Sequence, residues 1–193
     1  KSELAARTKN LTSLKELTVE TAKSELAFAR AQIRPHFLHN AINTIVSFCY
    51  IDGEAAARLL TDLSQYLRYS FDFDPQNDIV TLGKEIGLVK AFADIQSARF
   101  SNRINIEYDI EKASGALVPA FCIQPLVENA IKHGFDGENP LNIKVSAETT
   151  DQSLVITVAD DGRGISAERL AEIEADNNCG IGIKSVRKRL ADF

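Results

Sequence analysis

Two amphipathic helical segments joined by very few residues are the feature that most constrains the fold of this chain. Apolar side chains recur at helical spacing over about residues 11–48 and again over about residues 59–71. The Asp52-Gly53 pair between them is a typical turn sequence. Helices connected so closely are expected to pack antiparallel as a helical hairpin. Because one hairpin buries little apolar surface, we expect two copies to form a four-helix bundle in a homodimer.

The hydrophobic pattern changes after this helical part. The polar stretch Asp72–Asp78 is the predicted linker. Period-two alternation then appears at residues 104–110 and 141–147, and a further strand is expected over residues 154–159. Helices are expected at Leu82–Arg99, Pro119–His133, Ala167–Glu174 and Gly182–Leu190, with Gly134 closing the second. Strands and helices mixed in this way predict an α+β fold in which helices cover one face of a sheet. The expected domains are residues 1–74 and 75–193.

Composition excludes several classes of protein. The net charge of -5, without a basic cluster, argues against nucleic-acid binding. No apolar run approaches the roughly 20 residues that span a bilayer. The three cysteines are far apart and form no CxxC pair, so a disulfide framework or zinc site is not expected and a reducing cytoplasm is. A start at Lys1 and an end within a predicted helix indicate a piece of a longer protein.

A polar line crosses the first helical segment. Pro35 should bend that helix without ending it, because the apolar spacing resumes at once. The polar line is formed by Gln32, His36, Asn40, Asn43 and Ser47, beside an apolar stripe. A lone histidine there is most simply a surface or interfacial residue. The alternative is a nucleophile, since one ring nitrogen of a neutral imidazole is unprotonated at pH 7.

Three motifs downstream are typical of a nucleotide site. Asp160–Gly164 follows a predicted strand, and its glycines allow backbone to approach a ligand closely. Gly180–Val186 places two glycines directly before a helix, where free amides can face phosphate oxygens. Glu128–Gly134 brings an amide, a cation and an imidazole within two turns of one helix. Each motif alone could be structural, but their combination in this order is more specific.

With these motifs in place, the chain from about Glu25 onward resembles the LytS-type sensor histidine kinases. Gln32–Asn43 resembles their H box, which reads Gln-x-x-Pro-His-Phe-x-x-Asn, and Gln124–Gly134 resembles their N box. Asp160–Gly164 and Gly180–Val186 resemble their G1 and G2 boxes. The resemblance implies a helical dimerisation and phosphoacceptor module, then the two-layer α/β sandwich that gyrase, Hsp90 and MutL share. It also implies ATP and Mg²⁺ as cofactors.

The resemblance assigns a role to individual positions. His36 would accept the γ-phosphoryl group, and Asn129 would ligate Mg²⁺. Asp160 would accept a hydrogen bond from the adenine amino group. Further nucleotide-binding positions implied by the family are Glu128, Lys132, His133, Gly162, Gly164, Gly180 and Gly182. The last two glycines would let a lid over about residues 165–179 close on the phosphates.

Some positions of this chain differ from those of related proteins, and the differences bear on its chemistry. Related ATPases carry a water-activating glutamate where this chain has Pro125, so transfer to a protein nucleophile is favoured over hydrolysis. Many histidine kinases carry an acid directly after the phosphoacceptor, where this chain has Phe37. Glu128 is therefore the candidate catalytic base. Asn40 occupies the position that in related kinases orients water for dephosphorylating the partner regulator, which suggests a phosphatase role.

The predicted function is that of a two-component sensor kinase. Autophosphorylation on His36 would be followed by transfer to an aspartate in the receiver domain of a response regulator. A non-catalytic dimeric scaffold that binds nucleotide and an ATPase of the same fold are the alternatives. The chain stops before the family's glycine-threonine motif and closing strands, so the ATP-binding domain is expected to be incomplete. We expect the cytoplasmic portion of a bacterial sensor whose membrane anchor lies in segments absent here.

Overall fold

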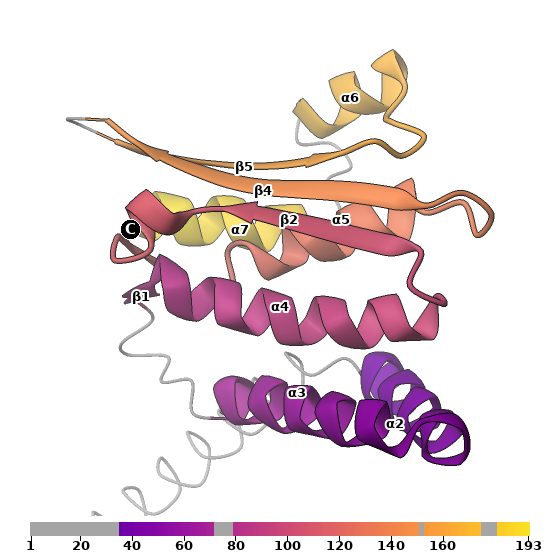
Figure 1. The fold of residues 1–193 in the computed structure, drawn as a ribbon. Coiled ribbons are helices and arrows are strands. Elements are labelled where there is room, and N and C mark those ends of the chain that lie inside the picture. The colour runs from indigo at the N-terminus through magenta and orange to yellow at the C-terminus, as the bar shows by residue number, and fades with distance from the viewer. Residues whose placement is uncertain (1–34, 72–78, 151–152, 175–180) are drawn as a thin grey trace, which may run out of the picture. The chain divides into compact units, whose positions relative to one another are not determined.

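The computed structural model describes residues 35–71, 79–150, 153–174 and 181–193. They fall into two compact units, one ending at His39 and the other spanning Asn40–Phe193. Helices come first along the chain and a mixed α/β domain follows (Figure 1), as predicted. The helix expected before Pro35, the linker Asp72–Asp78 and the proposed boundary at residues 74 and 75 lie outside the described residues. No described helix has the length and apolar character that crossing a membrane requires.

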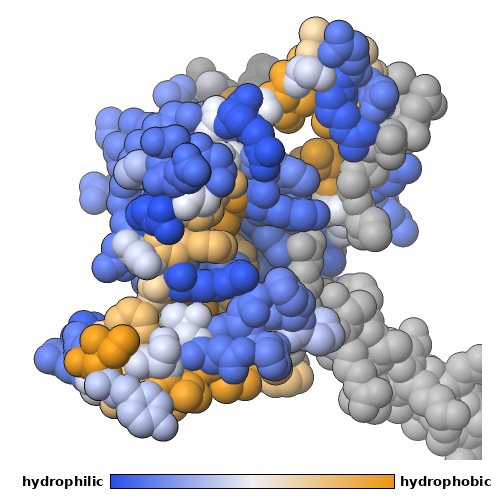
Figure 2. Space-filling view, turned by 90° about the vertical axis from the view of Figure 1, so that its right-hand side faces the viewer, coloured by the Kyte–Doolittle hydropathy of each residue, from blue (hydrophilic) through white to orange (hydrophobic). Residues whose placement is uncertain are grey.

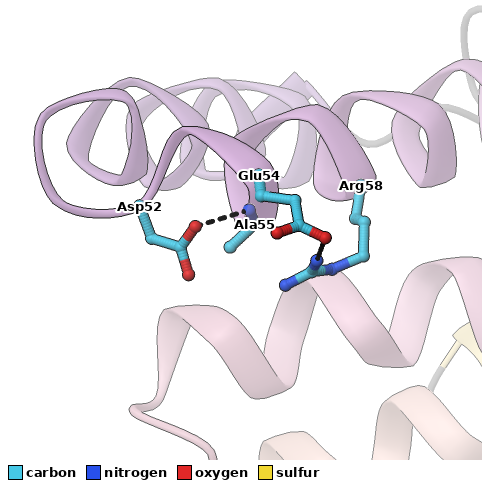
Figure 3. A network of polar contacts seen from close by, with 4 residues as sticks. All are labelled: Asp52, Glu54, Ala55 and Arg58. Carbon is cyan, nitrogen blue, oxygen red and sulfur yellow. Dashed lines mark hydrogen bonds and ion pairs between the residues drawn. The ribbon is translucent and has the colours of Figure 1, made fainter.

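A single residue separates the first two described helices, α2 (Pro35–Ile51) and α3 (Gly53–Phe71). The Asp52 side chain caps α3, since its Oδ1 accepts a hydrogen bond of 3.0 Å from the Ala55 N–H. One turn further, Arg58 forms a 2.9 Å ion pair with Glu54 (Figure 3). The predicted two-residue turn is therefore tighter than expected, with Gly53 as the first helical residue.

Helix α3 packs chiefly along α4 (Leu82–Arg99). Its buried face consists of Ala56, Leu59, Leu63, Tyr66 and Ser70. Close contacts between α2 and α3 are few, so the sequence did not predict the main packing partner of α3. The four-helix bundle requires a second copy of the chain and stays a prediction.

The N-terminal end of α4 is fixed by hydrogen bonds to three of its free amides. Thr81 is the N-cap, and its Oγ1 accepts from the Lys84 N–H at 3.3 Å. The Leu82 and Gly83 amides donate to the carbonyl oxygens of Ala116 and Ser114, at 2.7 and 2.8 Å. Apolar side chains are buried around most of this helix, which indicates that it lies between two layers.

The α/β domain contains two small sheets. Strands β1 (Ile79–Thr81) and β3 (Leu117–Pro119) pair antiparallel. The larger sheet has the order β2-β4-β5, with β2 (Ile104–Asp109) parallel to β4 (Leu141–Thr149), and β5 (Leu154–Asp160) antiparallel to β4. Helices α4, α5 (Gln124–Gly134) and α7 (Ile181–Asp192) cover one face of this sheet (Figure 1). The predicted arrangement of helices on one face is confirmed.

The core of this domain lies between the sheet and its helices. The strand β4 turns alternate side chains into it, namely Leu141, Ile143, Val145 and Ala147. Two short elements complete the described chain, the 3₁₀ helix η1 (Glu111–Ala113) and the helix α6 (Ala167–Glu174). The strands β1 and β3, three residues each, were not predicted.

One predicted helix begins in the wrong place. The helix expected from Pro119 starts at Gln124, because Pro119 ends β3 and Phe121 has a positive φ of 57°. That backbone conformation is incompatible with a right-handed helix. The residues between are apolar and buried, so their composition continued the hydrophobic pattern without being helical.

Candidate functional site

One wall of a pocket of about 520 Å³ is formed by α5. Pro125 occupies the first turn of this helix, where a missing N–H costs nothing. Asn129 and His133 follow at intervals of four residues, so they share a helix face, and both line the pocket. The local sequence thus places an amide and an imidazole side by side at the pocket wall.

Another part of the pocket lining comes from the end of β5, where backbone packs against the backbone of α5. Asp160 lines the pocket, and its Oδ1 accepts a hydrogen bond of 3.1 Å from the Gly162 N–H. A Cβ on Gly162 would lie only 2.3 Å from the Cα of Gly134 at the end of α5. The Arg163 Nε donates to the His133 carbonyl oxygen at 2.5 Å. These contacts hold the G1-like segment against the end of α5.

The neighbouring carboxylate, Asp161, has a structural role instead. Its two oxygens accept from the backbone and side-chain amides of Asn142, at 2.8 and 2.7 Å. These hydrogen bonds lower the pKa of Asp161 below its usual range. Of the two adjacent aspartates, only Asp160 lines the pocket.

The remaining lining is apolar with cations at its edge. The apolar side chains are Leu126, Ala130, Val158, Ile165, Ile173 and Ile183. Arg163 and Arg169 also line the pocket, and Arg169 forms a 2.6 Å ion pair with Glu172 on α6. An apolar pocket lined by one carboxylate and two arginines suits an aromatic base that carries phosphates.

The cations affect the imidazole at the pocket wall. The pKa of His133 is lowered from its usual value, first by partial burial and then by the charges of Lys132, Arg163 and Arg169. The neutral form is therefore favoured at pH 7. A neutral imidazole can donate or accept a hydrogen bond at a phosphate or a metal-bound water.

His36 lies in the first turn of α2 and is exposed. The apolar stripe on this helix is buried at Phe37, Ala41 and Ile45, with exposed fractions of 5%, 1% and 4%. Asn40, one turn after His36, is half-buried. The predicted separation of an apolar face from a polar face carrying the histidine is confirmed for the described part of the helix.

Comparison with known proteins identifies the family. The Histidine kinase family description matches residues 24–104, and that of the Histidine kinase-, DNA gyrase B-, and HSP90-like ATPase family matches residues 119–193. The sensor protein LytS of Staphylococcus saprophyticus is 39% identical over 174 residues, which are 86% of this chain. This chain belongs to the LytS-type histidine kinases.

Two further relatives show how much of each protein is shared. YwpD of Bacillus subtilis strain 168 is 35% identical over 195 residues, which cover all of this chain and 70% of YwpD. The sensor histidine kinase/phosphatase LytS of Staphylococcus aureus strain MRSA252 is 36% identical over 176 residues. This histidine kinase chain spans only about 30% of the LytS relatives' length.

The structure places the predicted nucleotide-binding residues of the kinase unevenly. Asn129, His133, Asp160 and Gly164 line the pocket. Glu128, Lys132, Gly162 and Gly182 are not among its lining residues, although a Cβ on Gly182 would lie 3.7 Å from the Asn129 Nδ2. Gly180 and residues 175–179 of the expected lid lie outside the described residues.

Arg169 and Ser166 line the pocket of this histidine kinase and fall within the lid expected over about residues 165–179, but sequence reasoning did not single them out as site residues. Both lie C-terminal to the glycine motif, in and before α6, where no sequence pattern marks them. The α6 helix is short and mostly exposed, so its side chains show no periodic signal of burial. Arg163 belongs to the motif, and its contact with α5 became visible only in three dimensions.

The donor set fits Mg²⁺ bound through the nucleotide. No group of three or more His, Cys, Asp or Glu side chains that could hold a metal occurs in the described part of the chain. Mg²⁺ commonly keeps several waters and takes few protein ligands plus phosphate oxygens. The Asn129 carboxamide at the pocket wall is suited to be such a single ligand.

Proposed function

We propose that this histidine kinase transfers the γ-phosphoryl group of ATP to His36, and then to an aspartate in the receiver domain of a response regulator. The pocket between α5 and the end of β5 supports nucleotide binding, since it joins an apolar slot to Asp160 and flanking cations. The exposed position of His36 on a polar helix face supports its role as nucleophile.

The pocket residues divide the work of holding ATP. Asp160 accepts a hydrogen bond from the adenine amino group. Ile165 in the loop before α6, Ile173 on α6 and Ile183 on α7 cover the adenine ring. Asn129 would hold Mg²⁺, which would neutralise phosphate charge, and Lys132, His133 and Arg163 would supply further donors to the phosphates. Gly162, Gly164 and Gly182 let backbone approach the nucleotide, and Gly180, which lies outside the described residues, has the same role in our proposal. Phosphoryl transfer needs mainly such positioning and neutralisation of charge.

The transfer step forms one bond, breaks one bond and releases one proton. An unprotonated ring nitrogen of His36 forms a P–N bond with the γ-phosphorus as the bond to the β–γ bridging oxygen breaks, and ADP leaves with that electron pair. The proton on the other ring nitrogen passes to a base. Because Phe37 is buried and apolar, the base must come from elsewhere, and Glu128 on α5 is our candidate.

Hydrolysis of ATP by the same pocket is disfavoured by Pro125. It lies one helical turn before Asn129, and its ring packs near Gly182, where a Cβ would be 3.6 Å from the Pro125 Cβ. A proline has no group to activate water. Phosphate release without a labelled histidine would instead support the ATPase alternative.

A phosphatase activity towards the regulator is a second candidate function. Asn40 lies one turn after His36 and shares its helix face, from which its carboxamide can orient a water. A LytS relative is itself named a sensor histidine kinase/phosphatase. Loss of dephosphorylation with retained autophosphorylation in Asn40→Ala would support this role, whereas unchanged dephosphorylation would refute it.

A histidine kinase of this kind is expected to act with a second copy of itself and within a larger sensor. We propose a homodimer formed through α2 and α3, and a sensor whose cytoplasmic part this chain represents, with membrane anchoring supplied by other segments. Figure 2 shows hydrophobic side chains gathered where α2 turns into α3. Tyr50 and Ile51 there are 88% and 79% exposed. An exposed apolar surface of this kind marks a protein interface.

His36→Gln tests the central step, and His39→Gln, one turn away on the same helix, is the matched control. With ATP labelled at the γ position, we expect His36→Gln to abolish acid-labile labelling and His39→Gln to retain it. Nucleotide affinity should be unchanged in both. Persistent labelling of His36→Gln would refute the assignment. Nucleotide binding without any labelling of the unmodified chain would favour the scaffold alternative.

A further inference from the structure

A buried carboxylate on α4 holds the backbone that leads into the pocket helix. Glu85 is fully buried, and its Oε2 accepts from the Phe121 N–H at 2.9 Å while its Oε1 accepts from the Ile123 N–H at 3.0 Å. The Tyr69 hydroxyl on α3 donates to the same Oε2 at 3.1 Å. Burial raises the pKa of Glu85, and the two backbone donors and the phenol oppose that shift. One side chain therefore joins three segments of the chain.

A second phenol on the same face of α3 reaches the pocket helix directly. Tyr66, only 2% exposed, accepts a hydrogen bond of 3.0 Å from the Nε2 of Gln124, the first residue of α5. Tyr66 and Tyr69 are three residues apart, so they point to the same side of α3. Tyr66 thus binds the first residue of α5 directly, whereas Tyr69 acts on the preceding segment through Glu85 and the Phe121 ring.

The segment between these points is under backbone strain. Phe121 has a φ of 57°, a conformation that side-chain-bearing residues rarely adopt. Its ring packs edge-on against the Tyr69 ring at 5.4 Å, and the Arg189 guanidinium of α7 lies 5.8 Å from it. Arg189 also donates to the Ala120 carbonyl oxygen at 3.0 Å. Strained backbone persists only where surrounding contacts determine it, and α3, α4 and α7 all contact this segment.

The segment leads directly into the nucleotide pocket. Phe121 and Ile123 precede α5, which carries Asn129 and His133 to the pocket wall, and α7 supplies Ile183. A shift of α3 along or about its axis would move both phenols, and with them the first turn of α5. The start of α5 is expected to follow such a shift and not to separate from α3. Separation would leave the Glu85 carboxylate buried with fewer hydrogen bonds, which costs free energy.

From this geometry we propose that Glu85, Tyr66 and Tyr69 are positioning residues that couple helix α3 of the phosphoacceptor part to the nucleotide pocket through the start of α5. The proposal rests on the proposed function, because it describes how the same pocket is regulated. A signal that moves α3 would then alter the placement of Asn129. Nucleotide in the pocket would in turn alter the stability of α3, since coupling between two sites is reciprocal.

Hydrogen exchange in the full chain tests this coupling. The backbone amides of residues 67–71, at the end of α3, are followed with and without the β,γ-imido analogue of ATP and Mg²⁺. We expect bound nucleotide to change their exchange rate by about fivefold, the lower end of typical coupling between sites. In the double variant Tyr66→Phe, Tyr69→Phe, the analogue should still protect α5, but the change in α3 should be lost.

Tyr108→Phe is the matched control. Its hydroxyl is buried on β2 and has no hydrogen-bond partner within the described ranges, so the same atom is removed without breaking a bond. The control should keep the response of α3. The single variants should each lose part of it, which provides a second measurement if the double variant folds poorly.

The possible results separate the coupling proposal from the nucleotide site on which it rests. Protection of α5 without any change in α3 of the unmodified chain would overturn the coupling alone. An undiminished response in the double variant would overturn it as well. Absence of protection in α5 itself would overturn the proposed nucleotide site, and the coupling that depends on it. If Tyr66 and Tyr69 merely stabilised the fold, the variants would unfold at a lower midpoint but keep the response of α3.

Discussion

At the scale of single residues, the pocket depends on an unusually close approach of two backbones. Gly134 ends α5 and Gly162 follows β5, and the space between them has no room for a methyl group. A Cβ on Gly134 would itself lie 3.0 Å from an Asp160 carboxylate oxygen. The pair therefore positions the carboxylate that we assign to adenine, although Gly162 itself is not a lining residue.

Gly162→Ala should damage both stability and binding. The added Cβ would lie 2.8 Å from the carbonyl carbon and oxygen of Gly134, so the backbone must shift. We expect a loss of about 2 kcal/mol in the free energy of unfolding, typical of overpacking, and about a tenfold weaker affinity for ATP. Urea titration and nucleotide titration measure the two effects.

Gly115→Ala is the control for this substitution, because no atom lies within 4 Å of its added Cβ. It should change the free energy of unfolding by less than about 0.5 kcal/mol. Equal effects of the two substitutions would show that the approach of Gly162 to Gly134 is not what limits the pocket.

Sequence reasoning found residues that lie within motifs and missed residues that only tertiary packing brings to the site. Asn129, His133 and Asp160 were predicted because each lies in a motif that resembles the N box or the G1 box of the histidine kinases. Arg169 and Tyr66 lie outside the motifs, and only tertiary packing brings them to the site or to its supporting helix. A helix surface pattern shows which residues are buried, but not which backbone they will meet.

At the scale of elements, α4 organises the domain, with α3 on one side and the β2-containing sheet on the other. Its start is held by the Thr81 cap, which is also the last residue of β1. The cap thus joins the small sheet to the helix that carries Glu85. Strand and helix boundaries at this point are set by one side chain and by the two carbonyl oxygens that receive the Leu82 and Gly83 amides.

Thr81→Ala should destabilise this junction. Losing an N-cap hydroxyl leaves the Lys84 amide without its 3.3 Å acceptor and costs about 1 kcal/mol. Thr61→Ala is the control, since Thr61 is exposed within α3 and its hydroxyl only bonds the Ala57 carbonyl of its own helix. That change should be neutral or slightly stabilising because alanine favours helix. Chemical unfolding followed by circular dichroism distinguishes them, and equal midpoints would contradict the capping role.

The elements also show where a hydrophobic pattern is informative. The bounds of α4 were predicted correctly, and the structure shows that the helix begins directly after its Thr81 cap and runs for eighteen residues. The strands β1 and β3 were missed, since three residues are too few for alternation to appear. The start of α5 was misplaced because Ala120–Ile123 are apolar and buried, yet their conformation is set by Glu85 from another helix.

At the scale of the whole molecule, the chain combines a compact α/β domain with helices that expose apolar surface. The described part of α2 carries Ile42 and Val46 at 47% and 50% exposed, one turn apart, followed by Tyr50. These lie on a different face from the buried stripe through Ala41 and Ile45. Two apolar faces on one helix are more than the described packing uses, which is why we assign the exposed one to a second copy.

Val46→Lys and Val155→Lys separate this interface from general surface effects. The two valines are almost equally exposed, at 50% and 52%, but Val155 lies on β5 of the sheet. A lysine in an apolar interface should weaken dimerisation by about tenfold or more, whereas one on the sheet should not. Light scattering over a range of protein concentrations gives the dissociation constants.

Because α3 follows α2 after a single residue, the dimer contact adjoins the helix whose tyrosines hold the start of α5. If Val46→Lys leaves the mass unchanged, the dimer must form through another surface. The proposed route of a signal from that interface to α3 would then need revision.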